Sequence, residues 1–469
     1  MLLKYNEAEM SPTSPDGGYN FISQAVDIFP ASMKRTDVRK FSTVENFLRR
    51  RYRKIAFLLM VCLIFTMTPC AVFAEDAEAV DTVEDSVVDV ISRAEEILPT
   101  VLPTSITDGA VGMAVDAKSA ILIDAGSGTV LFDQNSHDRL PPASVTKVMT
   151  MLLIMEAIDR GQMSLEDKVT VSEKAASMGG SQMYMEPGEQ QKLETLMMGI
   201  AIASANDACV AAAEHHSGSV EIFVENMNKR AQELGMKDTN FVNTNGLPVA
   251  NHYTSAYDIA LMSKELLKHE KIQDWFSIWM TNITVGLPGK KQTELGLTNT
   301  NRLIKTYPGA NGIKTGFTQE AGYCLSAAAK KGDLNLIAVI MGSPTTKIRF
   351  AEAAKLLDYG FANYDSVKLA EKGEPMGTVV IEKGSPNLVN AVAPENVSVL
   401  VKKGEKDTVK GELVFKDSIS APIAKGDQLG ELVIYKKDKE IGRYPVVAED
   451  NVKKASLMQI YLRMIKTLA

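Results

Sequence analysis

The chain has 469 residues, of which 45% are hydrophobic and 23% are charged, and its formal net charge is -7. This composition is typical of globular proteins, and the length allows two or three domains. The acidic balance argues against nucleic-acid binding, which needs a basic surface, and no zinc-finger, phosphate-loop or dinucleotide fingerprint occurs. None of the five histidines has zinc-ligand spacing to another, so neither a metal nor any other cofactor is expected.

Residues 49–74 predict export from the cytoplasm. A basic cluster, 49–54, precedes an uncharged apolar run, 55–67, and small residues that end at Ala74. This is the order of a secretory signal peptide, and cleavage is expected after Ala74. An uncleaved membrane anchor is the alternative, because the stretch from Ile55 to Ala74 is just long enough to span a bilayer.

The segments that flank this signal carry no chemical motif. Residues 1–48 form an N-terminal extension, which reflects either a start assigned too early, with Met33 as another candidate, or an unusually long export signal. Residues 75–110 are acidic and poor in aromatic residues, as in a solvated linker. Only Cys209 and Cys324 follow the signal, and both lie in apolar runs, which favours buried free thiols over a disulfide.

Residues 111–365 have the pattern of an α+β domain. Two apolar runs around a Gly-rich turn predict a β-hairpin, and amphipathic helices follow it. Strands at both ends with helices between them indicate an antiparallel sheet covered by helices. The expected elements are hairpin strands 120–124 and 129–132, helices 148–159, 193–215, 219–234 and 255–269, strands 322–329 and 334–341, and a last helix, 347–359.

The pattern changes twice beyond residue 365. Short β runs separated by turn residues predict a small all-β domain over 366–450. In 451–469, apolar residues recur with the helical period and the charged residues are basic, as in helices that lie in a membrane interface. Packing on its own β domain is the alternative for this helix. Its apolar face comprises Leu457, Met458, Tyr461, Met464, Ile465 and Leu468, and its basic residues are Lys453, Lys454, Arg463 and Lys466.

The segment from Pro142 to Lys147 is the first that carries chemistry. A serine hydroxyl is a weak nucleophile and needs an adjacent base. Ser144 and Lys147 are three residues apart, so on a helix their side chains share a face. Pro142 favours a helix start, and burial by the apolar residues that follow would lower the pKa of the lysine. For this motif taken alone, an ordinary helical turn with an exposed lysine is the alternative.

Two further polar motifs follow in the chain. Ser204 and Asn206 lie in an Ala-rich helical stretch, where polar residues are otherwise unfavourable. Lys314, Thr315 and Gly316 begin a strand, where the lysine offers a cation for a carboxylate and the glycine lets a ligand backbone approach closely. In this order, the three motifs predict a serine acyl-transferase that binds a free carboxylate.

The order S-x-x-K, S-x-N and K-T-G resembles that of the penicillin-binding proteins and serine β-lactamases. The hairpin before Ser144 and the segments 243–247, 255–260 and 321–323 are similar to those of the low-molecular-weight D-alanyl-D-alanine carboxypeptidases. The resemblance runs from about Ala114 to the C-terminus. It implies a penicillin-binding/β-lactamase-like transpeptidase domain, a small all-β domain and a terminal amphipathic helix. It also implies an exported enzyme at the outer face of the bacterial cytoplasmic membrane or in the cell wall.

The resemblance implies a division of roles among the motif residues. Ser144 would attack the penultimate D-alanine carbonyl of a peptidoglycan peptide stem, with Lys147 as general base. Ser204 would relay a proton to the leaving D-alanine, and Asn206 would orient Lys147 and the peptide amide. β-lactam antibiotics would acylate the same serine as covalent inhibitors.

The same resemblance assigns the binding of the terminal carboxylate to Lys314 and Thr315. Arg302 would assist, although a strand-end arginine is also a common solvated surface residue. The backbone N–H groups of Ser144 and Phe317 would form the oxyanion hole. Phe317 is a departure, because some family members have histidine at this position.

Three alternative functions remain open from the sequence. A class A β-lactamase uses a glutamate to activate the deacylating water, and the segment 235–249 contains none. A D,D-endopeptidase of the same family would use the same motif residues. A catalytically inactive wall-binding receptor is disfavoured, because Ser144, Lys147, Ser204 and Lys314 are all present.

Overall fold

The computed structural model describes residues 113–468 apart from 288 and 291. The predicted N-terminal extension, signal peptide and acidic linker therefore lie outside the described residues. Within the described part, the elements follow the α+β order expected for residues 111–365, and β strands dominate after Tyr364. The domain boundaries proposed from composition stay predictions.

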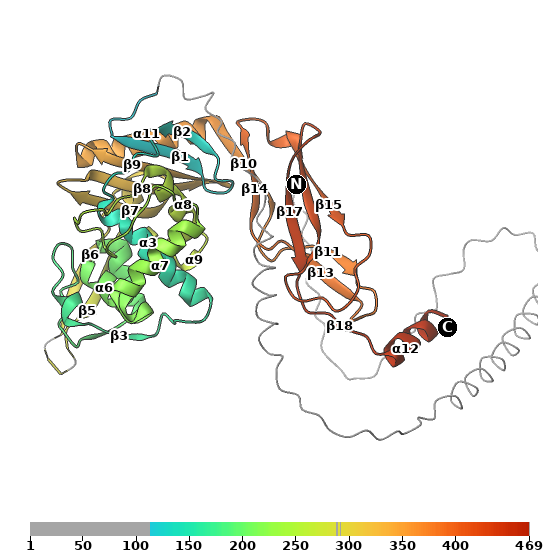
Figure 1. The fold of residues 1–469 in the computed structure, drawn as a ribbon. Coiled ribbons are helices and arrows are strands. Elements are labelled where there is room, and N and C mark those ends of the chain that lie inside the picture. The colour runs from blue at the N-terminus through green and yellow to red at the C-terminus, as the bar shows by residue number, and fades with distance from the viewer. Residues whose placement is uncertain (1–112, 288, 291, 469) are drawn as a thin grey trace, which may run out of the picture. The chain divides into compact units, whose positions relative to one another are not determined.

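A five-stranded antiparallel sheet in the order β2-β1-β9-β8-β7 organises the first half (Figure 1). Four of its strands, all except β2, are rich in small or β-branched residues, and successive side chains point to opposite faces. In β1, Ile121 and Ile123 join one hydrophobic cluster, whereas Ala120 and Leu122 join another on the opposite face. The strands are β1 Ser119–Asp124, β2 Val130–Gln134, β7 Ala310–Thr318, β8 Gly322–Lys331 and β9 Leu334–Ser343.

Helices cover both faces of this sheet (Figure 1). The long helix α11, Thr346–Asn363, packs on one face. Its N-cap is Thr345, whose hydroxyl accepts a hydrogen bond from the N–H of Ile348. On the other face lie α3 Lys147–Asp159, α6 Asn206–Ser217, α7 Val220–Glu233, α8 Ala256–Leu266 and α9 Glu270–Ser277. Shorter elements of this region are α4 Glu173–Ala176, α5 Leu193–Met198, α10 Leu303–Thr306 and two antiparallel strand pairs, β3 Lys168–Thr170 with β4 Gln190–Lys192 and β5 Met280–Val285 with β6 Thr293–Thr298.

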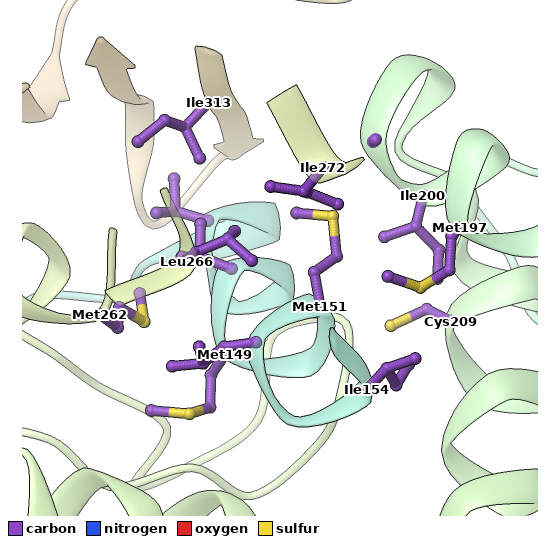
Figure 2. Close-up of a cluster of buried hydrophobic side chains, with 14 of the residues drawn as sticks. Met149, Met151, Ile154, Met197, Ile200, Cys209, Met262, Leu266, Ile272 and Ile313 are labelled. Carbon is purple, nitrogen blue, oxygen red and sulfur yellow. The ribbon is translucent and has the colours of Figure 1, made fainter. Parts of the chain in front are cut away.

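Helix α3 runs through the largest hydrophobic cluster (Figure 2). Met149, Met151 and Ile154 on this helix pack among side chains from α5, α6, α8, α9 and β7, and all three are fully buried. Because α3 is buried on every side from Lys147 to Met155, it is a core helix rather than a surface helix. The first residue of α3 is Lys147, so the hydrophobic core that buries the helix also buries the side chain of this lysine.

The expected single helix over 193–215 is wrong. Helix α5 ends at Met198, a π-helical turn spans Gly199–Ala203, and Ser204 then takes a left-handed conformation at φ 64°. Helix α6 starts only at Asn206. The Ala-rich sequence keeps the helical period through the break, and only its tertiary contacts reveal it.

The second half has its own sheet and its own core. A five-stranded antiparallel sheet has the order β11-β13-β17-β16-β15, and two strand pairs, β10 with β14 and β12 with β18, accompany it. The all-β prediction is therefore confirmed. The strands are β10 Tyr364–Ala370, β11 Pro375–Val380, β12 Gly384–Ser385, β13 Leu388–Val392, β14 Val397–Lys402, β15 Val409–Phe415, β16 Gln428–Lys436, β17 Lys439–Ala448 and β18 Lys453–Lys454.

The described chain ends with helix α12, Leu457–Leu468. Six of its large apolar side chains are exposed, and Leu457 exposes 87% of its surface and Met458 65%. The other four are Tyr461, Leu462, Met464 and Ile465. None of the helices in the described residues is long and apolar enough to cross a membrane.

Candidate active site

Ser144 and Lys147 meet at the start of α3. Ser144 lies in the one-turn 3-10 helix Ala143–Thr146, directly before the helix, and is half-buried. Lys147 is fully buried, and its Nζ lies 2.9 Å from the Oγ of Ser144 and 2.8 Å from the carbonyl oxygen of Asn245. Both contacts are within hydrogen-bond range, so the predicted pairing of hydroxyl and amine is present.

Burial sets the electrostatics of Lys147. Desolvation lowers its pKa from 10.5 to about 8, although the charges of Cys209 and Asp207 oppose the shift. A neutral amine has two N–H donors and one lone pair. One N–H can donate to the carbonyl of Asn245 while the lone pair accepts the proton of Ser144, which is the arrangement that a general base needs.

The turn that carries Ser144 is held by a buried polar chain. The N–H of Val242 donates to Nδ1 of His252, so Nε2 of the histidine carries the proton and donates to the hydroxyl of Thr146 at 2.8 Å. That hydroxyl in turn donates to the carbonyl of Ala143 at 2.9 Å. Ala143 has a φ of 49°, a strained value for alanine. The chain therefore stabilises an unfavourable backbone conformation next to the nucleophile.

Ser204 and Asn206 lie where the π-helical turn gives way to α6. Asn206 is nearly buried, and its Nδ2 donates to the carbonyl of Gly179 at 2.6 Å, while its Oδ1 has no hydrogen-bond partner in the described chain. No hydrogen bond joins Ser204 or Asn206 to Lys147 among the described residues. Asp207 instead accepts the backbone N–H of Met183 with both carboxylate oxygens and fixes the loop that faces Asn206.

Strand β7 brings the third motif against the nucleophile. A Cβ on Gly316 would lie 2.8 Å from the carbonyl oxygen of Pro142 and 3.1 Å from the backbone nitrogen of Ser144. The glycine is thus required by the protein's own turn, in addition to any ligand that approaches the strand. Lys314 is buried, and burial, followed by the charges of Lys147 and Arg349, lowers its pKa well below the usual value.

The hydroxyl of Thr315 already donates a hydrogen bond within the protein. Its Oγ1 donates to the Oγ1 of Thr300 at 2.8 Å, while the Nζ of Lys314 donates to the carbonyl of Thr315 at 3.1 Å. Phe317 is 52% exposed and stacks on Tyr323 with ring centroids 4.3 Å apart. Arg302 is exposed and directly precedes α10.

Sequence reasoning missed three residues of this site. Arg349 on α11 is buried and donates from Nη1 to the carbonyl oxygens of Gly316 and Cys324, at 3.0 and 3.1 Å. Burial lowers its pKa to about 10. Asn245, which contacts Lys147, and Thr300, which contacts Thr315, lie outside the three motifs. The segment 243–247 contributes to the family resemblance, but no local pattern assigns a role to Asn245, Thr300 or Arg349, because long-range packing brings them to the site.

The site lacks the side chains of a metal centre. No group of His, Cys, Asp and Glu residues within 113–468 could hold a metal ion. Cys209 and Cys324 are buried free thiols, as predicted, and burial raises the pKa of both. Thiol chemistry is therefore suppressed around a site whose strongest nucleophile candidate is the Ser144 hydroxyl.

A half-buried serine hydrogen-bonded to a buried lysine, beside a strand that carries the buried Lys314 and contacts the buried Arg349 of α11, defines a serine acyl-transfer enzyme of the penicillin-binding fold. Residues 106–345 match the family model described as D-alanyl-D-alanine carboxypeptidase, and residues 364–454 match the penicillin-binding protein 5 C-terminal domain. The chain belongs to the family of serine-type D-alanyl-D-alanine carboxypeptidases. The predicted family, fold class and enzyme class are confirmed.

Individual proteins of this family are similar to the chain over most of their length. The chain is 48% identical over 352 residues to D-alanyl-D-alanine carboxypeptidase DacF of Bacillus subtilis, a match that covers 75% of this chain and 90% of the relative. It is 33% identical to DacC of Escherichia coli over 72% of this chain and 85% of the relative. The crystal structure of penicillin binding protein 5 from Haemophilus influenzae superposes with a TM-score of 0.57 at 32% identity, over 74% of this chain and all of that one.

Proposed function

We propose that this chain removes the terminal D-alanine from pentapeptide stems of peptidoglycan through an acyl-enzyme on Ser144. The observation that carries the proposal is the contact of 2.9 Å between the Oγ of Ser144 and the buried Nζ of Lys147, whose pKa of about 8 leaves part of the amine neutral near neutral pH. A neutral amine at this distance is a competent general base for the serine.

In the acylation step, the Oγ of Ser144 attacks the carbonyl carbon of the penultimate D-alanine and its proton passes to the Nζ of Lys147. The backbone N–H groups of Ser144 and Phe317 stabilise the oxyanion. The peptide bond then breaks, and the leaving amine takes up the proton, with Ser204 as the relay. Water hydrolyses the ester in a second step, with Lys147 again as the base.

The basic residues of the site recognise the carboxylate end of the substrate. Lys314 and Thr315 bind the terminal carboxylate, and Arg349 adds a buried positive charge without an acidic partner in the described residues. Burial without an acidic partner disfavours the charged forms of Lys314 and Arg349, and an anionic ligand bound beside them would favour those charged forms. Arg302, which is exposed, contributes only long-range attraction. The buried Oδ1 of Asn206 has no partner and can accept the N–H of the stem peptide.

The decisive assay measures D-alanine released from a pentapeptide stem by the purified chain. Ser144→Ala should abolish release, whereas the matched control Ser277→Ala, an exposed serine bonded only to its own helix, should not change it. Fluorescent penicillin should label the wild type and leave Ser144→Ala unlabelled. An unlabelled wild type would support a receptor, rapid turnover of benzylpenicillin would support a β-lactamase, and cleavage of cross-linked dimers in preference to pentapeptides would support an endopeptidase.

We further propose that the chain is exported and that α12 attaches it to the membrane surface. The support is the row of exposed apolar residues on a short helix that also carries Lys466, together with the basic and apolar order of residues 49–74. Deletion of residues 457–469 spares β18, which pairs with β12, and tests the helix alone. The deleted form should no longer sediment with anionic vesicles, and retention on them would assign the attachment to another surface.

A further inference from the structure

Thr300 lies between two of the motif-bearing segments. Its backbone N–H donates to the carbonyl of Ile202 at 3.1 Å, two residues before Ser204. Its Oγ1 accepts the hydroxyl proton of Thr315 at 2.8 Å. One residue therefore contacts the turn that presents the proton relay and the strand that binds the carboxylate.

The position of Thr300 is fixed by its two neighbours. Asn299 donates from Nδ2 to the carbonyls of Phe276 and Ile278, at 3.0 and 2.9 Å. Asn301 donates from Nδ2 to the carbonyl of Gly312 at 2.7 Å. Both asparagines are buried, whereas Thr300 is half-buried. Side chains held in this way on both sides make a preorganised support for a functional contact.

The direction of the hydrogen bond between Thr315 and Thr300 matters for ligand binding. A hydroxyl has one proton and two acceptor lone pairs. In the structure the proton of Thr315 is directed to Thr300, so it is not available for a carboxylate. When a carboxylate arrives, the Thr315 hydroxyl can rotate and donate to it, and the Oγ1 of Thr315 can then accept a hydrogen bond from another hydroxyl. The hydroxyl of Thr300 lies close enough to donate this hydrogen bond to Thr315.

We propose that Thr300 is a positioning residue of the carboxylate site, acting through Thr315. The inference rests on the proposed carboxylate-binding role of Lys314 and Thr315. On binding, the Thr315 hydroxyl donates to the carboxylate and the Thr300 hydroxyl donates to the Oγ1 of Thr315, with no proton transferred between the residues. Two hydroxyls aligned in series polarise each other, which strengthens the bond to the anion.

The test compares ligands with and without a free carboxylate. The probes are benzylpenicillin and its methyl ester, and acylation of Ser144 is followed by mass spectrometry. Thr300→Val keeps the shape and the backbone N–H but removes the hydroxyl. It should slow acylation by the free acid about five- to tenfold, the effect of one lost hydrogen bond, and leave acylation by the ester unchanged. Thr300→Ser should behave as the wild type.

A matched control and a double-mutant cycle complete the design. Thr306→Val removes an exposed hydroxyl that bonds only the carbonyl of Arg302, and it should change neither rate. In a Thr315→Val background, Thr300→Val should have no further effect, because it acts only through the Thr315 hydroxyl. Thr300→Ala gives the same comparison if the valine variant folds poorly.

The outcomes separate this inference from the proposed function. Equal slowing with acid and ester, full additivity in the cycle, or no effect of Thr300→Val on the free acid would each overturn the role of Thr300. A wild-type chain that is acylated by neither probe would instead overturn the serine acyl-transfer mechanism itself.

Discussion

At the scale of single residues, the site depends on cations that are buried at a cost. Lys147 and Lys314 are both buried, and both have lowered pKa values chiefly because of desolvation. Lys147 thereby gains a neutral form that can act as a base, whereas Lys314 gains a position at which a bound carboxylate would favour the protonated, charged amine. The two shifts share a cause but serve different chemistry.

The pKa of Lys147 leads to a pH prediction. A general base works only when neutral, and the neutral fraction rises as pH increases through about 8. The acylation rate of Ser144 by benzylpenicillin, measured by rapid quench, should therefore rise between about pH 7 and 9 and then level off. Lys147→Arg should lower the rate on the order of 10²–10⁴-fold, the usual contribution of general base catalysis. A flat profile over this range would exclude Lys147 as the titrating base.

Sequence reasoning found the residues that carry motifs and missed those that act through packing. Ser144 and Lys147 were found because three residues of helical spacing place them on one face. Arg349 could not be found, since its carbonyl partners on β7 and β8 lie 33 and 25 residues away. The same holds for Asn245, which supplies a backbone carbonyl and therefore leaves no trace in its side-chain type.

At the scale of elements, the site is built where β7 meets the turn before α3. Periodicity predicted the β8 and β9 strands, whose alternation and length are unambiguous, and it predicted α11. It could not predict the break at Ser204, because Gly199, Ile200 and Ala201 continue the helical pattern without any capping signal. The secondary structure can thus be predicted from the sequence where local preference and tertiary packing agree. It departs from the prediction at the turn that carries Ser204.

The contact of β7 with the turn leads to a second prediction. Gly316→Ala places a Cβ 2.8 Å from the backbone oxygen of Pro142, and neither backbone segment can yield easily. The variant should lose most of its acylation activity, because β7 must move away from Ser144. Gly296→Ala is the matched control, since its Cβ would have a nearest neighbour at 3.5 Å. Penicillin labelling of both variants checks the prediction, and equal labelling would show that the contact is not needed.

The histidine under the same turn leads to a third prediction, on stability. Burial lowers the pKa of His252 from 6.5 to about 4, so the unfolded chain binds more protons between these values. Stability contributed by neutral His252 is complete above about pH 6.5 and is lost as pH falls toward 4, to a total of roughly 3 kcal/mol. Urea unfolding should show a loss of that order, which His252→Gln should largely remove. An unchanged pH dependence in the variant would assign the loss to other groups.

At the scale of the whole molecule, the chain has separate hydrophobic cores for its two halves. The clusters around α3 and around α11 share the first sheet, whereas the β-rich half has a cluster of its own. Sequence composition predicted this division from the change of pattern after residue 365. Separate cores allow separate unfolding, because cooperativity follows from shared buried contacts.

The placement of the tryptophans makes this division measurable. Both tryptophans, Trp275 and Trp279, lie in the region of α9 and β5, so tryptophan fluorescence reports only the half that contains Ser144. Circular dichroism reports both halves. On urea unfolding of residues 113–468, the two signals should not coincide. Acylation by benzylpenicillin should shift the fluorescence transition and the part of the circular dichroism change that accompanies it, and should leave the rest of the circular dichroism change in place, because the ligand is attached to the native catalytic half. Ser144→Ala should show no such shift. Coincident transitions that move together on acylation would mean that the two cores unfold as one unit.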